Sequence, residues 1–138
     1  MSSPYISVAL RQSLFDRANG RCEYCRTPES TSLAPHEIDH IVAQNMGVKP
    51  KPENLALSCT LCNKHKGSDL TSIDPTSGTI TPLFHPRQHR WVDHFKLEEA
   101  LIIPLTPEGR VTVRLLQLNR QDRLEERELL AVVGLLEL

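Results

Sequence analysis

The 138-residue sequence has few aromatic residues, no long apolar segment and no excess of basic charge. Aromatic side chains make up 4% of the chain, and they form no evident platform on which RNA bases could stack. The longest apolar segment runs from Leu129 to Leu136 and is far too short to cross a bilayer. No signal or transit segment opens the sequence. We therefore expect a cytoplasmic protein with no membrane partner.

Charge and histidine are unevenly distributed along the chain. The net charge of -1 at pH 7 argues only weakly against a non-specific nucleic-acid binder. Residues 1–96 contain 11 Lys and Arg against 9 Asp and Glu, whereas residues 97–138 contain 5 against 8. All six histidines lie between His36 and His94. The length suits a single domain over residues 1–138, with its chemistry in the middle section.

The cysteine pattern is the strongest signal in the composition. Two C-x-x-C pairs account for every cysteine: Cys22, Cys25, Cys59 and Cys62. A thioredoxin-like site needs only one such pair, and a disulfide framework is rare in the cytosol. Four thiolates suit a tetrahedral structural Zn²⁺, with a four-cysteine iron centre as the alternative. The long gap between the pairs indicates that the metal-closed loop contains another structural unit.

The pattern of apolar and turn residues predicts an α+β fold. We expect a helix over residues 7–18, strands over residues 37–43 and 54–59, and a helix over residues 60–70 that carries the second C-x-x-C pair. A helical extension over residues 84–138 follows. Its three helices are expected to open at Pro86, at Thr106-Pro107 and at Asn119. The last helix would carry an apolar stripe in the core or at a dimer interface, formed by Leu129, Val132, Val133 and Leu136.

The first strand contains an unusual pair, Asp39 followed by His40. Neighbouring strand residues point to opposite faces, so these two side chains cannot both lie on one ordinary solvent face. His40 could be a buried histidine whose hydrogen bonds are satisfied, and Asp39 could accept a backbone hydrogen bond at the strand end. The pair taken alone favours that structural interpretation.

Four segments in this order resemble the HNH endonuclease family, whose catalytic unit is a ββα-metal motif: CEYC, EIDHIVA, ENLALSC and CNKHKG. The resemblance covers about residues 20–70. Two later segments, HPRQHRWVDHF and TPEGRVTVRLLQLN, are similar to the C-terminal part of a bacterial subgroup of small stand-alone HNH proteins. The resemblance implies a ββα-metal unit built around the cysteine zinc site and flanked by N- and C-terminal helices.

The resemblance also implies a role for each matching residue. His40 corresponds to the general base, and Asp39 to a ligand of a catalytic divalent cation. Asn54 corresponds to the central Asn, which braces the loop between the strands and orients the base. Asn63 stands where the family name has its last His, and it would be a second metal ligand. Two oxygen ligands suit Mg²⁺ or Mn²⁺, so the resemblance implies a second metal beside the structural Zn²⁺.

The implied reaction is metal-dependent hydrolysis of DNA, leaving a 5′-phosphate and a 3′-hydroxyl. Double-stranded DNA is favoured over single-stranded DNA, and a homodimer is possible. A neutral histidine can take a proton from water near pH 7, while a divalent cation stabilises charge on the phosphate. The alternative is an inactive, zinc-stabilised module that binds nucleic acid or protein. The presence of all four residues of the motif favours the enzyme.

Several other polar residues are candidates for a role at the site, and most of them have a structural interpretation as well. Glu37 is either solvated or joins the metal shell through water, and His36 is expected to be polar but not catalytic. Three residues near the start of the 60–70 helix either contact phosphate or lie on a solvated face: Lys64, His65 and Lys66. Four residues of the extension either widen the DNA-binding surface or belong to a cover over the zinc site: His85, Arg87, Arg90 and His94. In the second reading, Trp91 and Phe95 anchor that cover.

Overall fold

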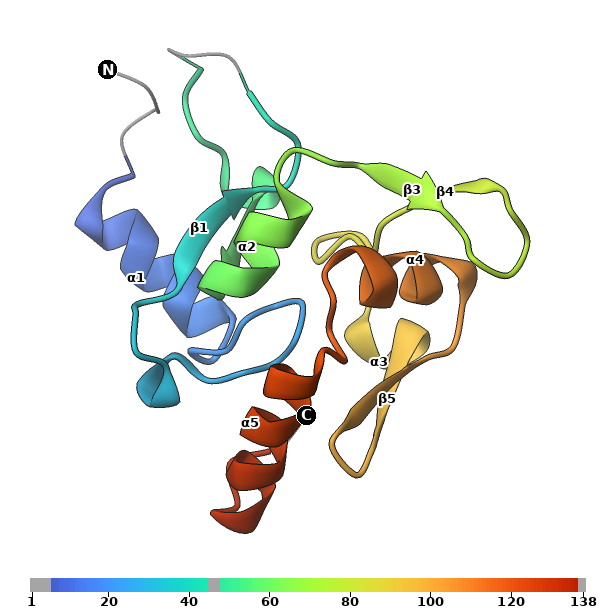
Figure 1. Cartoon of the computed structure of the whole chain (residues 1–138). Helices are drawn as coiled ribbons and strands as arrows, with labels where there is room; N and C mark the ends of the chain where they lie inside the picture. The colour runs from blue at the N-terminus through green and yellow to red at the C-terminus, as the bar shows by residue number, and fades with distance from the viewer. Residues whose placement is uncertain (1–5, 45–47, 137–138) are drawn as a thin grey trace.

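The computed structural model describes residues 6–44 and 48–136 of the chain. Within these residues, five α-helices and three two-stranded antiparallel sheets form the α+β fold that the sequence predicts. Figure 1 shows the first sheet and two helices in one half of the molecule, and the other two sheets with α3 and α4 in the second half. No helix in the described ranges has the length and apolar content needed to span a bilayer.

The first helix has nearly its predicted bounds and is followed by a tight turn. Helix α1 spans Val8–Arg17, and the Ser7 hydroxyl caps it by accepting the amide of Leu10 at 3.0 Å. Gly20 has a φ of +67°, a left-handed conformation that favours glycine. A Cβ at this position would lie 2.8 Å from the Phe15 ring, so the turn needs glycine for space as well. The chain then enters the first C-x-x-C pair directly.

The ββα unit has the predicted order. Strands β1 (Glu37–His40) and β2 (Leu55–Ser58) pair antiparallel, with Asp39 opposite Ala56 and His40 opposite Leu55. Helix α2 (Thr60–Lys66) follows at once and packs against β1 (Figure 1). All three elements are shorter than the sequence predicts. Helix α2 ends before Gly67, whose φ of +54° is not helical.

Two β-hairpins were not predicted. Strands β3 (Thr71–Ile73) and β4 (Ile80–Pro82) form the first. Strands β5 (Phe95–Glu98) and β6 (Leu101–Pro104) form the second, inside the extension expected to be helical. Each strand has only three or four residues, too few for a clear alternating pattern.

The helix expected to open at Pro86 begins later. Helix α3 spans Trp91–His94, because the preceding residues form a turn around His85. The Nδ1 atom of His85 accepts the amides of Arg87 and Gln88, at 3.2 and 3.3 Å. Such local side-chain bonds compete with helix formation.

The next helix has the predicted start. Helix α4 (Pro107–Leu115) opens at Pro107, with the Thr106 hydroxyl accepting the amide of Gly109 at 3.0 Å.

The prediction that Asn119 caps the last helix is wrong. Helix α5 (Gln121–Val132) has Arg120 at its N-cap position, without a side-chain cap. The side chain of Asn119 instead binds the backbone of Ile102 on β6, accepting its amide at 3.0 Å and donating to its carbonyl at 2.9 Å. The hairpin offers Asn119 an edge with both a donor and an acceptor, which the helix end does not.

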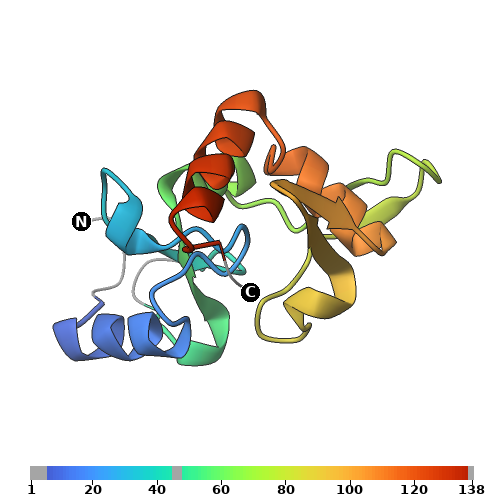
Figure 2. The same cartoon turned by 90° about the horizontal axis from the view of Figure 1, so that it is seen from below.

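The apolar stripe expected on the last helix does not lie in the core, so of its two expected places only the dimer interface remains a prediction. Leu129, Val132 and Val133 are exposed, at 69%, 84% and 65%. The buried residues of α5 are Leu130 and two arginines. In Figure 2, α5 lies between α2 on one side and α4 with the β5–β6 hairpin on the other. These neighbours cover the face of α5 that carries the two arginines.

One hydrophobic core joins both halves of the molecule. Three of the four cysteines belong to it, together with aromatic and aliphatic residues from the ββα unit and from α3, β5, β6 and the segment after α4. The largest of these are Tyr24, Phe84, Trp91, Phe95, Ile102, Leu116 and Leu118.

Candidate functional site

The four cysteines converge on one point. Their sulfur atoms all lie within 4.8 Å of one another, and Cys25 Sγ and Cys59 Sγ are 3.7 Å apart. Sulfur ligands 2.3 Å from a tetrahedral Zn²⁺ would be separated by about 3.8 Å, so the cluster has the dimensions of a closed metal site. In the described part of the chain, this is the only group of three or more His, Cys, Asp or Glu side chains with such spacing. The fold thus arranges all four cysteines to hold a metal ion.

Proton binding by these thiols depends on their neighbours. Burial raises the pKa of the Cys22 and Cys62 thiols. Hydrogen bonds with Cys22 lower the pKa of the Cys25 and Cys59 thiols. Four sulfurs in contact, three of them on buried cysteines, repel one another once they ionise, and a divalent cation removes that repulsion.

An arginine from α5 contacts this cluster. Arg123 is 5% exposed, and its Nη2 atom lies 3.1 Å from Cys62 Sγ and 3.7 Å from Cys59 Sγ. Its Nη1 atom donates to the Leu116 carbonyl at 3.0 Å. Burial opposes the charge of the guanidinium, but the nearby sulfurs outweigh burial and raise the pKa of Arg123. Sequence reasoning missed this contact, because Arg123 lies among other charged residues and no local pattern marks it as buried.

Asp39 points into the protein between β1 and α2. It is 3% exposed, and its Oδ2 atom accepts the Tyr24 hydroxyl at 2.7 Å. The Lys66 Nζ atom lies 3.3 Å from Oδ2 and 3.4 Å from Oδ1, and donates to the Ile41 carbonyl at 3.1 Å. Burial and the charge of Asp39 raise the pKa of Tyr24 well above its ordinary value, so the phenol keeps its proton and donates it.

Asn63 and Glu37 meet across the same interface. The Nδ2 atom of Asn63 on α2 donates to Glu37 Oε1 on β1 at 2.7 Å. Glu37 and Asp39 share one face of β1, because they are two residues apart in a strand. The hydrogen bond uses the amide nitrogen of Asn63 and leaves its oxygen as the atom that could bind a cation.

His40 leaves β1 on the opposite face from Asp39. Its Nε2 atom is buried and has no hydrogen-bond partner among the described residues. The next residues are held by Asn54, whose Oδ1 accepts the Val42 amide at 3.0 Å and whose Nδ2 donates to the Val42 carbonyl at 2.9 Å. The Asn54 carbonyl also accepts the amide of Ile41 at 2.9 Å. Asn54 therefore fixes the backbone immediately after His40.

The oxygens of Asp39 and Asn63 fit a hard divalent cation by donor type. They come from facing elements, β1 and α2. Tyr24 donates to Asp39 Oδ2 and not to Oδ1, and the side-chain oxygen of Asn63 takes no part in the bond that its Nδ2 donates to Glu37. Lys66 places one positive charge beside both oxygens of Asp39, and a divalent cation bound there would have to share the carboxylate with it. Mg²⁺ and Mn²⁺ are the ions that such oxygen pairs bind.

The three basic residues expected near the start of the helix lie instead in the last turn of α2, because this helix ends at Lys66. Lys64 is exposed. His65 is partly exposed and lies 3.4 Å from Arg120 Nη1 on α5, and Lys66 is 2% exposed. Lys66 therefore serves Asp39 in this structure, and only Lys64 and His65 are placed where an outside phosphate could reach them.

The extension covers the cysteine cluster. Trp91 Nε1 donates to the Tyr24 carbonyl at 2.8 Å, and the Trp91 and Phe95 rings have centroids 5.0 Å apart within the core. Arg87 is ion-paired with Glu23, next to the first cysteine. Among the charged residues of this cover, Arg90 is exposed.

Three histidines lie beside this cover. The rings of His89 and His94 have centroids 4.8 Å apart, and the rings of His85 and His89 have centroids 6.4 Å apart. Burial, followed by the charge of His89, lowers the pKa of His85 and of His94.

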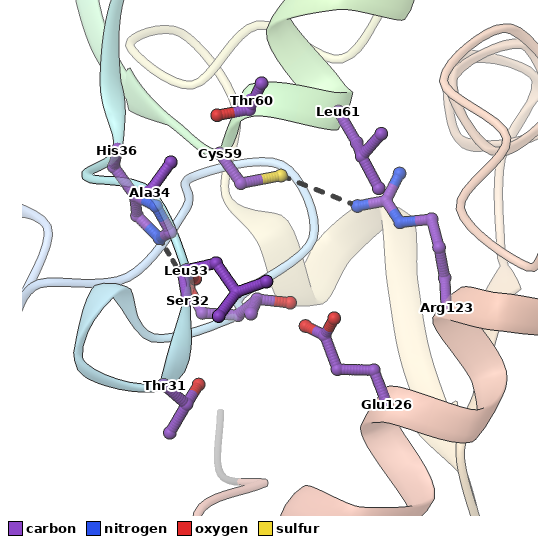
Figure 3. Close-up of a pocket in the computed structure, with 11 residues that line it drawn as sticks. Thr31, Ser32, Leu33, Ala34, His36, Cys59, Thr60, Leu61, Arg123 and Glu126 are labelled. Carbon is purple, nitrogen blue, oxygen red and sulfur yellow. Dashed lines mark hydrogen bonds between the residues drawn. The ribbon is translucent and has the colours of Figure 1, made fainter.

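A cavity of about 320 Å³ lies on another side of the cysteine cluster (Figure 3). Cys59 and Arg123 form part of its wall, and the exposed Leu33 and Glu126 lie across from them (Figure 3). His36 also lines it, 2% exposed, with Nε2 2.8 Å from the Thr27 carbonyl. Neither Asp39 nor His40 lines this cavity, so it is separate from the Asp39 site.

Comparison with known proteins agrees with the geometry. Residues 22–69 match the model of the HNH endonuclease family. The chain is 26% identical over 123 residues to the Septu protein PtuB of Bacillus thuringiensis, a match that covers 88% of this chain and 44% of that protein. The chain thus spans less than half the length of this relative. No solved structure gave a significant match. The family assignment made from the sequence is confirmed: the segment that holds the cysteine cluster and the ββα unit, residues 22–69, belongs to the HNH endonuclease family.

Proposed function

We propose that the protein is a metal-dependent HNH endonuclease that hydrolyses phosphodiester bonds in DNA. The observation that supports this most is the arrangement at the end of β1. Asp39 contacts Lys66 on α2, the helix that also carries Asn63. His40 leaves the strand on the other face, and Asn54 fixes the backbone that follows. A base and a carboxylate that depart in opposite directions from adjacent residues can act on different atoms of one phosphate.

In this proposal each residue has one task. His40 takes a proton from the attacking water through a ring nitrogen, and Asn54 keeps the His40 backbone in place. Asp39 and Asn63 would hold Mg²⁺ or Mn²⁺, which when bound stabilises the negative charge that develops on the phosphate and leaving oxygens. Lys64, His65 and Arg90 are the exposed or partly exposed basic residues that we assign to backbone phosphate contacts.

We assign a structural Zn²⁺ to the cysteine cluster. Four thiolates leave no open coordination position, so this ion has no direct part in hydrolysis. Its place in the core, together with Trp91 and Phe95, makes it a folding element that joins the ββα unit to the extension.

One observation favours the alternative, an inactive zinc-stabilised binding module. Asp39 is buried and already paired with Lys66, as a purely structural ion pair would be.

Homodimer formation through the exposed Leu129, Val132 and Val133 also stays a prediction, which light scattering of the purified protein tests. The cytoplasmic location and the preference for double-stranded DNA stay predictions as well.

Incubation of the zinc-loaded protein with supercoiled plasmid separates enzyme from module. We expect nicking with Mg²⁺ or Mn²⁺, none after brief mild chelation that leaves zinc bound, and recovery on adding Mg²⁺ alone. The His40→Ala variant should nick about 10²–10⁴-fold more slowly, the usual contribution of a general base. The control is Lys96→Ala, which changes an exposed side chain on β5, and it should nick at the wild-type rate. Equal nicking by His40→Ala and wild type would refute the proposed mechanism.

A further inference from the structure

Tyr24 connects the cysteine cluster to Asp39. It lies inside the first C-x-x-C pair, is 1% exposed, and donates its hydroxyl proton to Asp39 Oδ2 at 2.7 Å. A hydroxyl that donates to a carboxylate at this distance makes a strong, charge-assisted hydrogen bond. No other side-chain donor among the described residues lies this close to Asp39, since Lys66 Nζ is 3.3 Å away.

Tyr24 is itself held at three points. Its amide lies 3.4 Å from Cys22 Sγ, and its carbonyl accepts Trp91 Nε1 at 2.8 Å. Its ring packs edge-on against Phe84, with centroids 6.4 Å apart. The position of the phenol oxygen is therefore set by the first C-x-x-C turn and by the cover over it.

This hydrogen bond determines how Asp39 is presented to α2. With Oδ2 tied to Tyr24, the carboxylate cannot rotate freely, and Oδ1 keeps only the longer contact with Lys66. Removing a partner that fixes a metal-binding carboxylate in this way typically lowers metal affinity or activity about 10- to 100-fold.

We propose that Tyr24 is a positioning residue for the catalytic cation, through which the cysteine cluster sets the orientation of the Asp39 carboxylate. The proposal rests on the proposed function, because it assigns Asp39 as a cation ligand. It adds that the two metal sites are coupled, and that the coupling runs through a single phenol oxygen.

The test is Mn²⁺ affinity of the full-length, zinc-loaded protein, measured from the EPR signal of free Mn²⁺ without DNA. The Tyr24→Phe variant keeps the ring and its packing but lacks the donor, and we expect Mn²⁺ to bind roughly 10- to 100-fold more weakly while bound zinc stays at the wild-type amount. The matched control is Thr112→Val, which also removes a buried hydroxyl but on α4, where that group accepts the Phe84 amide at 2.8 Å. It should lower stability and leave Mn²⁺ affinity unchanged.

A double-mutant cycle shows whether Tyr24 acts through Asp39. If it does, the double variant Tyr24→Phe, Asp39→Asn should bind Mn²⁺ no more weakly than Asp39→Asn alone, because the shared interaction is already lost. Additive losses would contradict the proposal. So would a Tyr24→Phe variant with wild-type Mn²⁺ affinity, or one that loses its zinc or its circular dichroism signal, since Tyr24 would then have a purely structural role.

The same measurements distinguish a failure of the proposed function from a failure of the Tyr24 proposal alone. A wild-type protein that binds no Mn²⁺, or an Asp39→Asn variant that binds it as tightly as wild type, contradicts the cation site and the Tyr24 proposal with it. A wild type whose Mn²⁺ binding depends on Asp39 but not on Tyr24 contradicts the Tyr24 proposal alone.

Discussion

Replacing Lys66 by methionine would leave a buried carboxylate without its counter-charge. The Lys66 and Asp39 side chains are 2% and 3% exposed, with Nζ and Oδ2 3.3 Å apart, and Ile41 would lose the donor to its carbonyl. Methionine retains most of the length of the lysine stem, so packing changes little. Removing one member of a buried ion pair destabilises a protein by about 3–5 kcal/mol. At this chain length that loss lowers the melting temperature by about 10 °C or more.

Unfolding in urea, followed by the fluorescence of Trp91, measures this effect. Trp91 is the only tryptophan and is 8% exposed, so its emission reports directly on the core around the cysteine cluster. The matched control is Lys96→Met on β5. That lysine is 56% exposed and lies 3.9 Å from Glu98 Oε2, so its loss should change the free energy of unfolding by less than about 1 kcal/mol.

The same variant also tests the cation site. A divalent cation would supply the positive charge that Asp39 has lost, so Mn²⁺ should bind Lys66→Met more tightly than wild type. Because a ligand at about 100 times its Kd stabilises the folded state by about 2.7 kcal/mol, the rise in melting temperature on adding Mn²⁺ is measurable. It should be larger for Lys66→Met than for wild type. A variant as stable as Lys96→Met would refute the structural role of the pair, and an equal or smaller Mn²⁺ effect would refute the cation site beside Asp39.

Three further predictions address other parts of the structure. Arg123→Met should speed the loss of zinc to a chelator, because the sulfurs lose the guanidinium that lies over them; a colorimetric zinc assay measures this, and an unchanged rate argues against that role. Stability should fall as the pH drops below about 6.5, because the lowered pKa values of His85 and His94 let the unfolded chain bind protons first; melting curves between pH 8 and pH 5 test this, and a double glutamine variant should flatten the slope. Asn63→Ala should raise the Mg²⁺ concentration needed for half-maximal nicking, and an unchanged requirement rules it out as a ligand.

Short motifs with a strong physical cause were readable from the sequence. The two C-x-x-C pairs predicted a four-cysteine metal site, because few other arrangements use four cysteines in this way. Thr106-Pro107 predicted the start of α4, because the hydroxyl cap and the fixed φ of proline act locally. The spacing of Asp39 and Asn63 placed both on the interface between β1 and α2, but only through the resemblance to a family.

Features that depend on distant contacts were not readable. Nothing in the local sequence of α5 marks its arginines as buried, yet Arg123 and Arg127 are. Arg127 donates to the carbonyls of Ala100 and Leu118, at 2.6 and 2.5 Å, both of which lie outside its own helix. A guanidinium can enter a core when carbonyl or sulfur acceptors meet it there, and no local pattern shows where those acceptors lie. The two short hairpins were missed for a similar reason, since their pairing is set by packing against α4.

The central claim is that His40 activates water for hydrolysis at a cation site formed by Asp39, and chemical rescue tests it most directly. His40→Gly opens space beside β1, and single-turnover nicking of supercoiled plasmid in Mg²⁺ is measured with and without added imidazole. We predict that imidazole restores a large part of the lost rate in His40→Gly and none in Asp39→Asn, because a free base can replace a base but not a metal ligand. Wild-type nicking by His40→Gly without imidazole, or equal rescue of both variants, would contradict the account.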